Sequence, residues 1–332
     1  MTSKVEDRPR PAIEVRGLVK RYGQLTAVDG IDLQVQSGVT FGFLGPNGAG
    51  KSTTINILCT LAAATEGSAT VAGLDVTVER AEVRRRIGLV FQEPTLDGYL
   101  TADQNLRFHG ELYGVDRSTA AERRTEVLEM VGLVERRHDL VNTFSGGMRR
   151  RLEIARGLLH SPQVLFLDEP TIGLDPQTRS SIWAYIERLH ETRDITVFVT
   201  THYMDEAEHC DRIAIINEGR IVALGTPEEL KAGVGKDRVQ IDTDDNERAI
   251  AALAATFGLE AAVHEHAVTI SVANGAGFVP KLFERLGVPI SSVTVTRPTL
   301  DDVFLAHTGT TIRDAEEGSI NNRMIAMAFR RR

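Results

Sequence analysis

Short apolar runs alternate with helical patterns from Ile13 to about Gly235, and this alternation is typical of an α/β sheet. Four of the runs are nearly all apolar: Val39–Leu44, Ile87–Phe91, Val164–Leu167 and Thr196–Thr200. Parallel strands that are covered by helices on both faces have this composition. Polar residues follow each run, and open α/β sheets usually bind ligands at the carboxyl ends of their strands. The pattern therefore predicts a mostly parallel sheet with its chemistry at one edge.

A hairpin is expected at the end of this sheet domain. Arg212–Ile216 and Ile221–Leu224 are apolar, and the turn between them contains Gly219, which can supply a positive φ. The hairpin should close a domain that spans residues 13–235.

A helical insert is expected inside the domain. Ala102–Tyr113 and Ala120–Val131 show helical spacing and carry many charges. They predict a largely helical segment over about residues 95–160, on one side of the sheet.

The composition changes after Pro227, where a second set of elements begins. The expected order is strand Arg238–Ile241, helix Glu247–Phe257, one or two strands in Ala262–Val272, helix Phe278–Leu286 and strand Ile290–Thr296. This order predicts a small α+β domain over residues 236–308. We expect a flexible arm over residues 1–12 and a tail over residues 309–332, because neither has an apolar period.

Length and charge narrow the class of protein. The 332 residues are too many for one compact core, so two domains are expected. The net charge of −8 leaves no broad basic field, so a nucleic-acid partner is not expected. No apolar run approaches the roughly 18 residues of a membrane-spanning helix. The cysteines, Cys59 and Cys210, have no metal-ligand spacing around them and fit a reducing cytosol.

One motif carries most of the chemistry. The G-x-x-x-x-G-K-[ST] phosphate loop is matched by Gly45, Pro46, Asn47, Gly48, Ala49, Gly50, Lys51 and Ser52. It follows a predicted strand and opens a predicted helix, Thr53–Leu61, as the motif requires. Backbone N–H groups through Thr53 would surround phosphate, Lys51 would reach the β- and γ-phosphates, and Ser52 would ligate Mg²⁺. The expected cofactors are therefore ATP and Mg²⁺.

Polar residues at three other strand ends complete a candidate hydrolytic site. Asp168 and Glu169 end the run Val164–Leu167; one suits Mg²⁺, directly or through water, and Glu169 suits the attacking water. His202 follows Thr196–Thr200 and can bind the γ-phosphate or that water. Gln92 can offer its amide oxygen to Mg²⁺ and water. Each alone is commonly an ordinary strand-end residue, and the phosphate loop is what favours the functional interpretation.

Two further features are candidates for nucleotide contacts. Tyr22 could stack on adenine or could be a core tyrosine. Ser145, Gly146 and Gly147 begin a predicted helix and could bind a γ-phosphate, or Ser145 could be a plain N-cap.

Together these features, in this order, resemble the ATP-binding cassette over roughly Ile13 to Leu230. The D-loop of that family is matched by Gly173-Leu174-Asp175. The resemblance implies a phosphate-loop NTPase fold whose mostly parallel core is accompanied by an antiparallel N-terminal β part. It also implies a head-to-tail homodimer, in which the Ser145 loop of one copy closes over the γ-phosphate held by Lys51 of the other.

The C-terminal part, which ends in Arg297–Phe304, is similar to the appended domain of drug-export cassettes of the daunorubicin-resistance type. This resemblance implies an ATP hydrolase that powers efflux of a drug-like or polyketide compound through a separate polytopic permease. The protein would then sit on the cytoplasmic side of the cell membrane, and Glu93–Leu100 would couple it to the permease.

Three residues depart from the cassette pattern: Phe144, Met148 and Ile172 replace the usual Leu, Gln and Ser or Thr. Met148 cannot form a strong hydrogen bond, so a contact made by the usual Gln is in doubt. The alternative function is a soluble cassette ATPase acting in translation or DNA maintenance. A single cassette without a sustained heptad stretch or a basic surface disfavours it.

The role of the C-terminal domain is open between ligand sensing and dimerisation. Val268, Ile270 and Val272 alternate with polar residues, as do Val293 and Val295. A half-buried strand face has this pattern, which favours dimerisation.

Overall fold

The computed structural model describes residues 11–192, 195–264 and 267–309. The arm expected over residues 1–12 and the tail expected over residues 309–332 lie almost entirely outside these ranges. The described chain divides into two compact units between Pro227 and Glu228, earlier than the boundary expected after residue 235. Each unit has its own sheet and its own apolar core.

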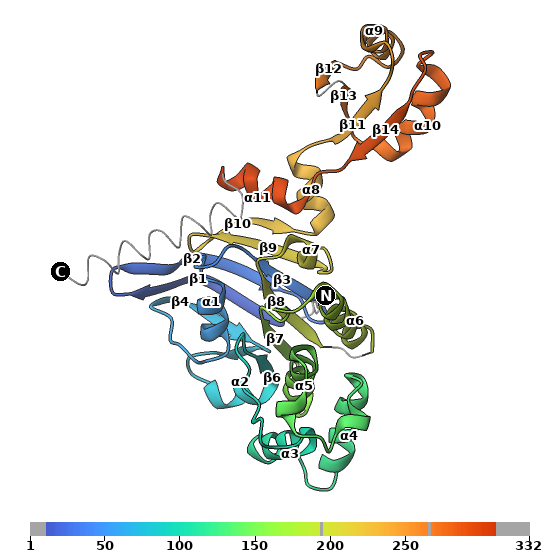
Figure 1. The fold of residues 1–332 in the computed structure, drawn as a ribbon. Coiled ribbons are helices and arrows are strands. Elements are labelled where there is room, and N and C mark those ends of the chain that lie inside the picture. The colour runs from blue at the N-terminus through green and yellow to red at the C-terminus, as the bar shows by residue number, and fades with distance from the viewer. Residues whose placement is uncertain (1–10, 193–194, 265–266, 310–332) are drawn as a thin grey trace, which may run out of the picture. The chain divides into compact units, whose positions relative to one another are not determined.

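The main sheet of the first unit has six strands in the order β10-β9-β3-β8-β7-β6 (Figure 1). Their bounds are β10 Arg220–Gly225, β9 Arg212–Asn217, β3 Thr40–Leu44, β8 Thr196–Thr201, β7 Val164–Asp168 and β6 Ile87–Val90. Strands β9, β3, β8, β7 and β6 run parallel, and β10 is antiparallel to β9. The four apolar runs are therefore strands of one parallel sheet, as predicted.

The predicted hairpin is β9–β10, and it extends this same sheet beside β3. Its two-residue turn has a positive φ at both positions, 47° at Glu218 and 80° at Gly219, where the sequence indicated the glycine alone. Both values suit the twist of a tight hairpin. The N–H of Gly219 donates to the carbonyl oxygen of Ala49 at 2.9 Å, so the turn also supports the phosphate loop, Gly45–Ser52.

A second, antiparallel sheet packs against the first. It has the order β2-β1-β4-β5, with bounds β2 Leu25–Val35, β1 Ile13–Tyr22, β4 Glu66–Val71 and β5 Leu74–Asp75. Helix α1, Lys51–Leu58, buries Ile55, Ile57 and Leu58 in the core that both sheets share. In that core the ring of Phe198 lies 5.5 Å from the rings of Phe41, Phe43 and Phe166. This layer of aromatic rings fixes the central strands that carry the site.

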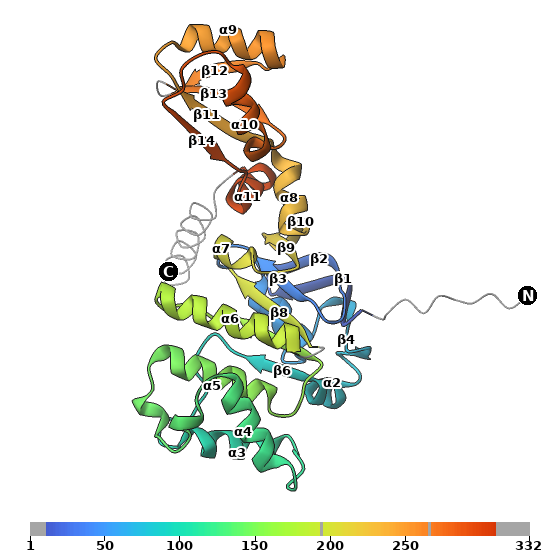
Figure 2. The same ribbon diagram turned by 90° about the vertical axis from the view of Figure 1, so that its right-hand side faces the viewer.

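Helices cover the main sheet and form the predicted insert (Figure 2). Besides α1 they are α2 Arg80–Arg86, α3 Ala102–Leu112, α4 Ala120–Met130, α5 Gly146–Leu158, α6 Pro176–Thr192 and α7 Met204–Ala207, with 3₁₀ turns at Val134–Arg136 and Val141–Thr143. Helix α8, Pro227–Val234, begins at the boundary and belongs to the second unit. Asp103 of α3 binds Arg124 of α4 at 3.1 Å and Arg137 at 2.6 Å, which ties the insert together.

The second unit is the small α+β domain that the sequence predicts. Its antiparallel sheet has the order β12-β13-β11-β14. The elements are β11 Asp237–Asp242, α9 Asn246–Phe257, β12 Ala261–His264, β13 Ala267–Val272, α10 Gly275–Arg285, β14 Ser292–Thr296 and α11 Leu300–Thr308. Helix α11 was not predicted, although Thr299 and Asp302 form a capping box at its start.

The alternating apolar residues of this unit face its own core. Val268, Ile270 and Val272 are buried, and Val293 and Val295 pack against the same cluster. Their alternation is therefore explained within one copy of the domain, and it gives no support to a dimer interface there.

Acid should destabilise the insert through His109. Its ring lies 4.5 Å from that of Tyr113, which lies 4.3 Å from that of His160. Burial, the charge of Arg156 and His160 lower the pKa of His109 to about 3. An unfolded imidazole titrates near pH 6.5, so below about that pH the unfolded chain binds a proton that the folded chain does not. The free energy of unfolding therefore decreases as the pH is lowered.

We therefore expect His109→Gln to lose less stability than the unchanged chain between about pH 7 and pH 5, as measured by urea unfolding midpoints. The exposed His307 provides the control, because His307→Gln should leave the pH dependence unchanged. Identical pH dependence in the His109 variant would contradict this assignment.

Candidate functional site

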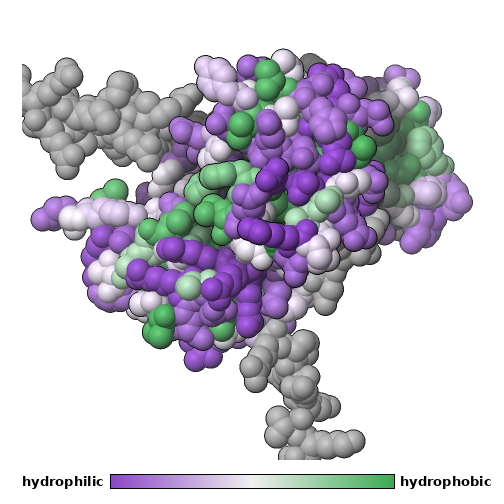
Figure 3. Space-filling model, turned by 90° about the horizontal axis from the view of Figure 1, so that it is seen from below, coloured by the Kyte–Doolittle hydropathy of each residue, from purple (hydrophilic) through white to green (hydrophobic). Residues whose placement is uncertain are grey.

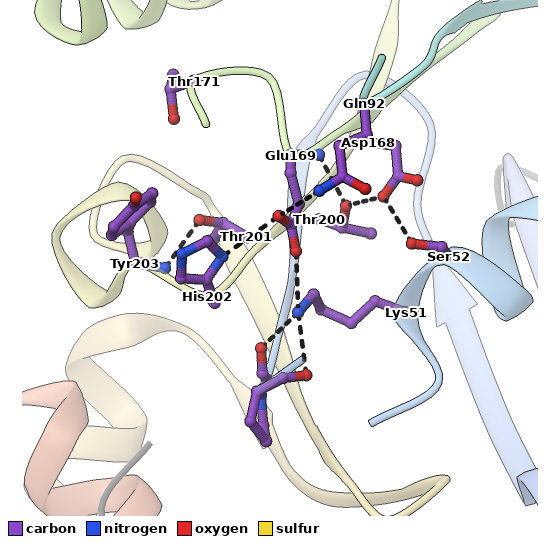
Figure 4. Close-up of polar contacts among 12 residues, drawn as sticks. Lys51, Ser52, Gln92, Asp168, Glu169, Thr171, Thr200, Thr201, His202 and Tyr203 are labelled. Carbon is purple, nitrogen blue, oxygen red and sulfur yellow. Dashed lines mark hydrogen bonds and ion pairs between the residues drawn. The ribbon is translucent and has the colours of Figure 1, made fainter. Parts of the chain in front are cut away.

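The carboxyl ends of four neighbouring strands meet at one edge of the main sheet. Register pairs Leu44 with Thr201, Asp168 with Thr200, and Val90 with Leu167. The phosphate loop after β3, His202 after β8, Glu169 after β7 and Gln92 after β6 therefore lie side by side (Figure 4).

The phosphate loop turns directly into α1, which begins at Lys51 and not at Thr53 as the sequence indicated. Its N-cap residue, Gly50, has a φ of 110°, and a Cβ there would lie 2.4 Å from the carbonyl oxygen of Ala27. Lys51 is buried, and its Nζ donates to the carbonyl oxygens of Gly45 at 2.6 Å and Pro46 at 3.1 Å. The loop thus holds one buried cation above a helix N-terminus, where an anion binds well.

The Glu169 carboxylate is the centre of the site. Its Oε1 lies 3.1 Å from Nζ of Lys51. Its Oε2 accepts a hydrogen bond from Nε2 of Gln92 at 3.3 Å and lies 3.4 Å from Nδ1 of His202. Lys51, Gln92 and His202 follow three different strands, and all three side chains lie next to Glu169, which follows a fourth strand.

These neighbours keep Glu169 ionised. Burial by itself raises the pKa of the carboxyl, but its interaction with the nearby His202 imidazole and the charge of Lys51 outweigh burial and hold the pKa below its usual value. A carboxylate in this state accepts hydrogen bonds at neutral pH and can orient a water molecule.

The backbone of Glu169 is strained. Its φ of 46° lies in the left-handed region, which costs a residue other than glycine about 1–3 kcal/mol and persists only where surrounding contacts impose it. Such contacts are present: its N–H donates to the carbonyl oxygen of Thr200 at 3.2 Å and to Oγ1 of Thr200 at 3.0 Å. The conformation turns the side chain from the strand toward Lys51.

Asp168 stands beside Ser52. The Ser52 hydroxyl donates to Oδ1 of Asp168 at 3.3 Å, and the Thr200 hydroxyl donates to the same oxygen at 2.5 Å. The structure thus brings Ser52 and Asp168 together, whereas Gln92, the third predicted metal ligand, contacts Glu169. Within the described ranges no three His, Cys, Asp or Glu side chains form a metal-binding cluster.

Sequence reasoning missed a buried carboxylate next to the site. Glu206 of α7 accepts hydrogen bonds from the hydroxyls of Thr171 and Thr201, the latter at 2.7 Å. It thereby links the segment after Glu169 to the residue before His202. Its position four residues after His202, in a polar helix start, was the available signal.

The Ser145 loop lies at the N-terminus of α5. Ser145 is an N-cap, since its hydroxyl accepts from the N–H of Met148 at 3.2 Å, and both Ser145 and Gly146 are exposed. Gly147 has a packing role, because a Cβ there would lie 2.4 Å from Cγ2 of Thr178 in α6. The N-cap interpretation therefore holds, and the exposed groups remain able to meet a ligand.

Asp175, from the D-loop match, sits at the start of α6. Its carboxylate accepts from the hydroxyl of Thr178 at 2.6 Å and from the backbone N–H of Thr178 at 3.0 Å. These hydrogen bonds, that of the hydroxyl first, lower the pKa of Asp175.

The remaining predicted residues lie at the periphery. Tyr22 is 50% exposed, which excludes the core interpretation, and Nζ of Lys20 lies 4.8 Å from its ring centre. Phe144 is buried, so it fills an apolar position as Leu would. Ile172 is exposed, and Met148 contributes its backbone N–H to the Ser145 cap.

This fold and this site define a phosphate-loop nucleoside triphosphatase. A family model described as ABC transporter matches residues 28–172, and one described as the ATP-binding protein DrrA1-3-like C-terminal domain matches residues 225–308. The linearmycin resistance ATP-binding protein LnrL of Bacillus subtilis is 40% identical over 91% of this chain and its own full length. The daunorubicin/doxorubicin resistance protein DrrA of Streptomyces peucetius is 42% identical over 91% of this chain and 94% of its own.

Solved structures agree with this assignment. The dimeric ADP- and phosphate-bound cassette MJ0796 is 28% identical, with a TM-score of 0.59 over 64% of this chain and 98% of its own. The cbiO1 protein of Clostridium perfringens is 25% identical, with a TM-score of 0.63 over 75% of this chain and 96% of its own. The chain therefore belongs to the ABC transporter ATP-binding proteins and is an ATP hydrolase, so the resemblance seen in the sequence is confirmed.

Substitution of Gly50 should separate backbone strain from steric conflict. Gly73 also has a positive φ, 75°, but no atom lies within 4 Å of a Cβ there. We expect Gly73→Ala to cost about 1–2 kcal/mol of unfolding free energy and to bind ATP normally. Gly50→Ala should cost more and lose binding of a fluorescent ATP analogue, because it also displaces the loop. Equal behaviour of the two variants would show that the contact with Ala27 is unimportant.

Proposed function

We propose that this ATP hydrolase drives efflux of a drug-like or polyketide compound through a separate membrane permease. The observation that carries the proposal is the convergence of Lys51, Gln92 and His202 on the Glu169 carboxylate. Besides residues that can bind nucleotide, the site therefore has a carboxylate that can accept a proton from water, as hydrolysis requires. The names of the relatives, which are resistance ATP-binding proteins, support the class of transported compound.

In the proposed complex, ATP binds along the phosphate loop. Lys51 contacts the β- and γ-phosphates, the backbone N–H groups from Gly45 to Thr53, apart from Pro46 which has none, surround them, and Tyr22 stacks on adenine. The exposure of the Tyr22 ring supports that role.

The residues present fit Mg²⁺. The Ser52 hydroxyl and the Asp168 carboxylate are neighbouring oxygen donors, the amide oxygen of Gln92 is a third candidate, and Mg²⁺ prefers a few protein oxygens with phosphate and water. When bound, the ion would neutralise charge that develops on the phosphates.

Hydrolysis depends on water held against the γ-phosphate. Glu169 accepts a hydrogen bond from the attacking water and takes its proton, while His202 and Gln92 hold the carboxylate and the phosphate oxygens in position. Burial of the pair Lys51–Glu169 excludes bulk water and strengthens these interactions.

A second copy of the chain is proposed to complete the site. The exposed hydroxyl of Ser145 and the N–H groups of Gly146 and Gly147 lie at a helix N-terminus and would bind the γ-phosphate held by the partner copy. Asp175 would lie at the same interface. The similarity to the cassette MJ0796, whose structure is dimeric, supports the proposal of a dimer.

The permease is proposed to dock near Glu93–Leu100, which follows Gln92. Tyr99 is 88% exposed, and Phe108 and Leu112 of α3 are exposed too. Figure 3 shows apolar side chains among charged ones on the face seen from below, the side of α3 and α4 in Figure 1. Within the described ranges no helix is long and apolar enough to span a bilayer. We place the protein on the cytoplasmic side of the membrane, held by the permease.

Glu169→Gln tests the hydrolytic role. The amide keeps the shape of the side chain but cannot take a proton, so ATP should bind with unchanged affinity, steady hydrolysis should cease, and an ATP-bound dimer should accumulate on size exclusion. Lys51→Ala should instead weaken ATP binding itself. The exposed Glu247→Gln is the matched control and should be fully active. Normal turnover by Glu169→Gln would rule out the assignment.

Tyr99→Asp tests the docking surface. The chain should sediment with membranes when co-expressed with its polytopic permease partner, and Tyr99→Asp should remain in the supernatant with its ATPase activity intact, because a charge in a buried contact is costly. Val78 is similarly exposed, at 81%, but lies before α2. Val78→Asp should sediment normally. Sedimentation of both variants would refute docking at Tyr99.

A further inference from the structure

A buried arginine forms hydrogen bonds with the backbone on both sides of Glu169. Arg150, in α5, is 6% exposed. Its Nη2 donates to the carbonyl oxygen of Asp168 at 3.0 Å, and its Nε donates to that of Pro170 at 2.7 Å. These two carbonyl groups flank Glu169 in the chain, so one rigid guanidinium fixes the peptide units before and after the strained residue.

The same side chain reaches the segment that carries Gln92. Nη1 of Arg150 donates to the carbonyl oxygen of Phe91 and to Oε2 of Glu153, the latter at 3.1 Å. Glu153 is also buried, and its Oε1 accepts from the N–H of Thr95 at 2.7 Å and from the Thr95 hydroxyl at 3.3 Å. Together Arg150 and Glu153 therefore hold Phe91 and Thr95, which lie on either side of Gln92.

A space-filling role alone does not explain this pair. An apolar side chain fills buried volume without the cost of burying a charge, and burial does lower the pKa of Arg150. The planar fork of a guanidinium instead presents donors in fixed directions, and here they meet acceptors in two segments distant from α5, at Phe91 and at Asp168–Pro170, and Glu153 on α5 itself. That arrangement sets the relative positions of those segments.

We propose that Arg150 and Glu153 are positioning residues for hydrolysis. They hold Glu169 in its left-handed conformation and tie it to the Gln92 segment and to α5, the helix that begins at the Ser145 loop. A shift of either α5 or the Gln92 segment then moves the carbonyl groups that flank Glu169. This inference rests on the role proposed above for Glu169.

The first test is Arg150→Lys, which keeps the charge but cannot reach all of these acceptors. We expect kcat for ATP hydrolysis to fall at least about tenfold while the Kd for ATP changes less than about threefold, because a small misplacement of a catalytic group mainly affects the chemical step. Arg124→Lys is the control: it alters an arginine that is partly buried and paired with Asp103 in the helical insert, and it should keep both constants.

Glu153→Gln extends the test to the second residue. It retains an acceptor for Thr95 but weakens the hold on Arg150, so kcat should fall less than in Arg150→Lys. Unchanged kcat in both variants would overturn the proposal. An equal loss of ATP binding and of kcat would overturn it as well, because that outcome indicates general damage to the fold.

A double-mutant cycle separates positioning from damage. If Arg150 acts through Glu169, Arg150→Lys should reduce single-turnover hydrolysis little further once Glu169→Gln is present, whereas independent effects would multiply. Multiplied effects would refute positioning. If Glu169→Gln alone hydrolyses ATP normally, the proposed role of Glu169 fails; if it is inactive while Arg150→Lys is normal, only the present inference fails.

Discussion

The structure of the site depends on how one carboxylate is held. Glu169 must leave the end of a buried strand and turn toward Lys51, and its left-handed φ is the cost of that turn. Hydrogen bonds from its own N–H to Thr200, and from Arg150 to the neighbouring carbonyl groups, oppose the strain. The parallel register supplies the rest, because it places β8 directly beside β7. Without these constraints the four strand ends would present polar residues but no common centre.

Features that are local in sequence could be predicted. The run Val164–Leu167 is apolar because its strand is buried on both faces. The phosphate loop can be recognised from eight consecutive residues, because its glycines let the backbone surround phosphate and its lysine supplies the positive charge. The family resemblance then gave the fold class, which the structure and the comparisons confirm. Strand β1 was harder, since bulges around Gly17 break its alternation, and its burial pattern follows no period of two.

Features that depend on distant partners could not be predicted. Arg150 reads as one of three consecutive arginines on a helix, and nothing in that run says which one is buried. Thr200 reads as the last residue of a strand, although its hydroxyl and carbonyl both serve the site. The valines of β13 have the pattern of an interface, but α9 and α10 of the same unit cover that face. In each case the residue type can be read from the sequence, but the residue that it contacts is known only from the three-dimensional structure.

The pairing of Lys51 with Glu169 has a consequence for the order of events in turnover. Lys51 and Glu169 are buried counter-ions of each other, so the proposed base is paired with the ammonium group that is proposed to bind substrate. A nucleotide phosphate that recruits Lys51 withdraws the cation from Glu169 and makes that carboxylate more basic. Glu169 would then become an effective proton acceptor only when nucleotide is bound, so the site would be activated by its own substrate.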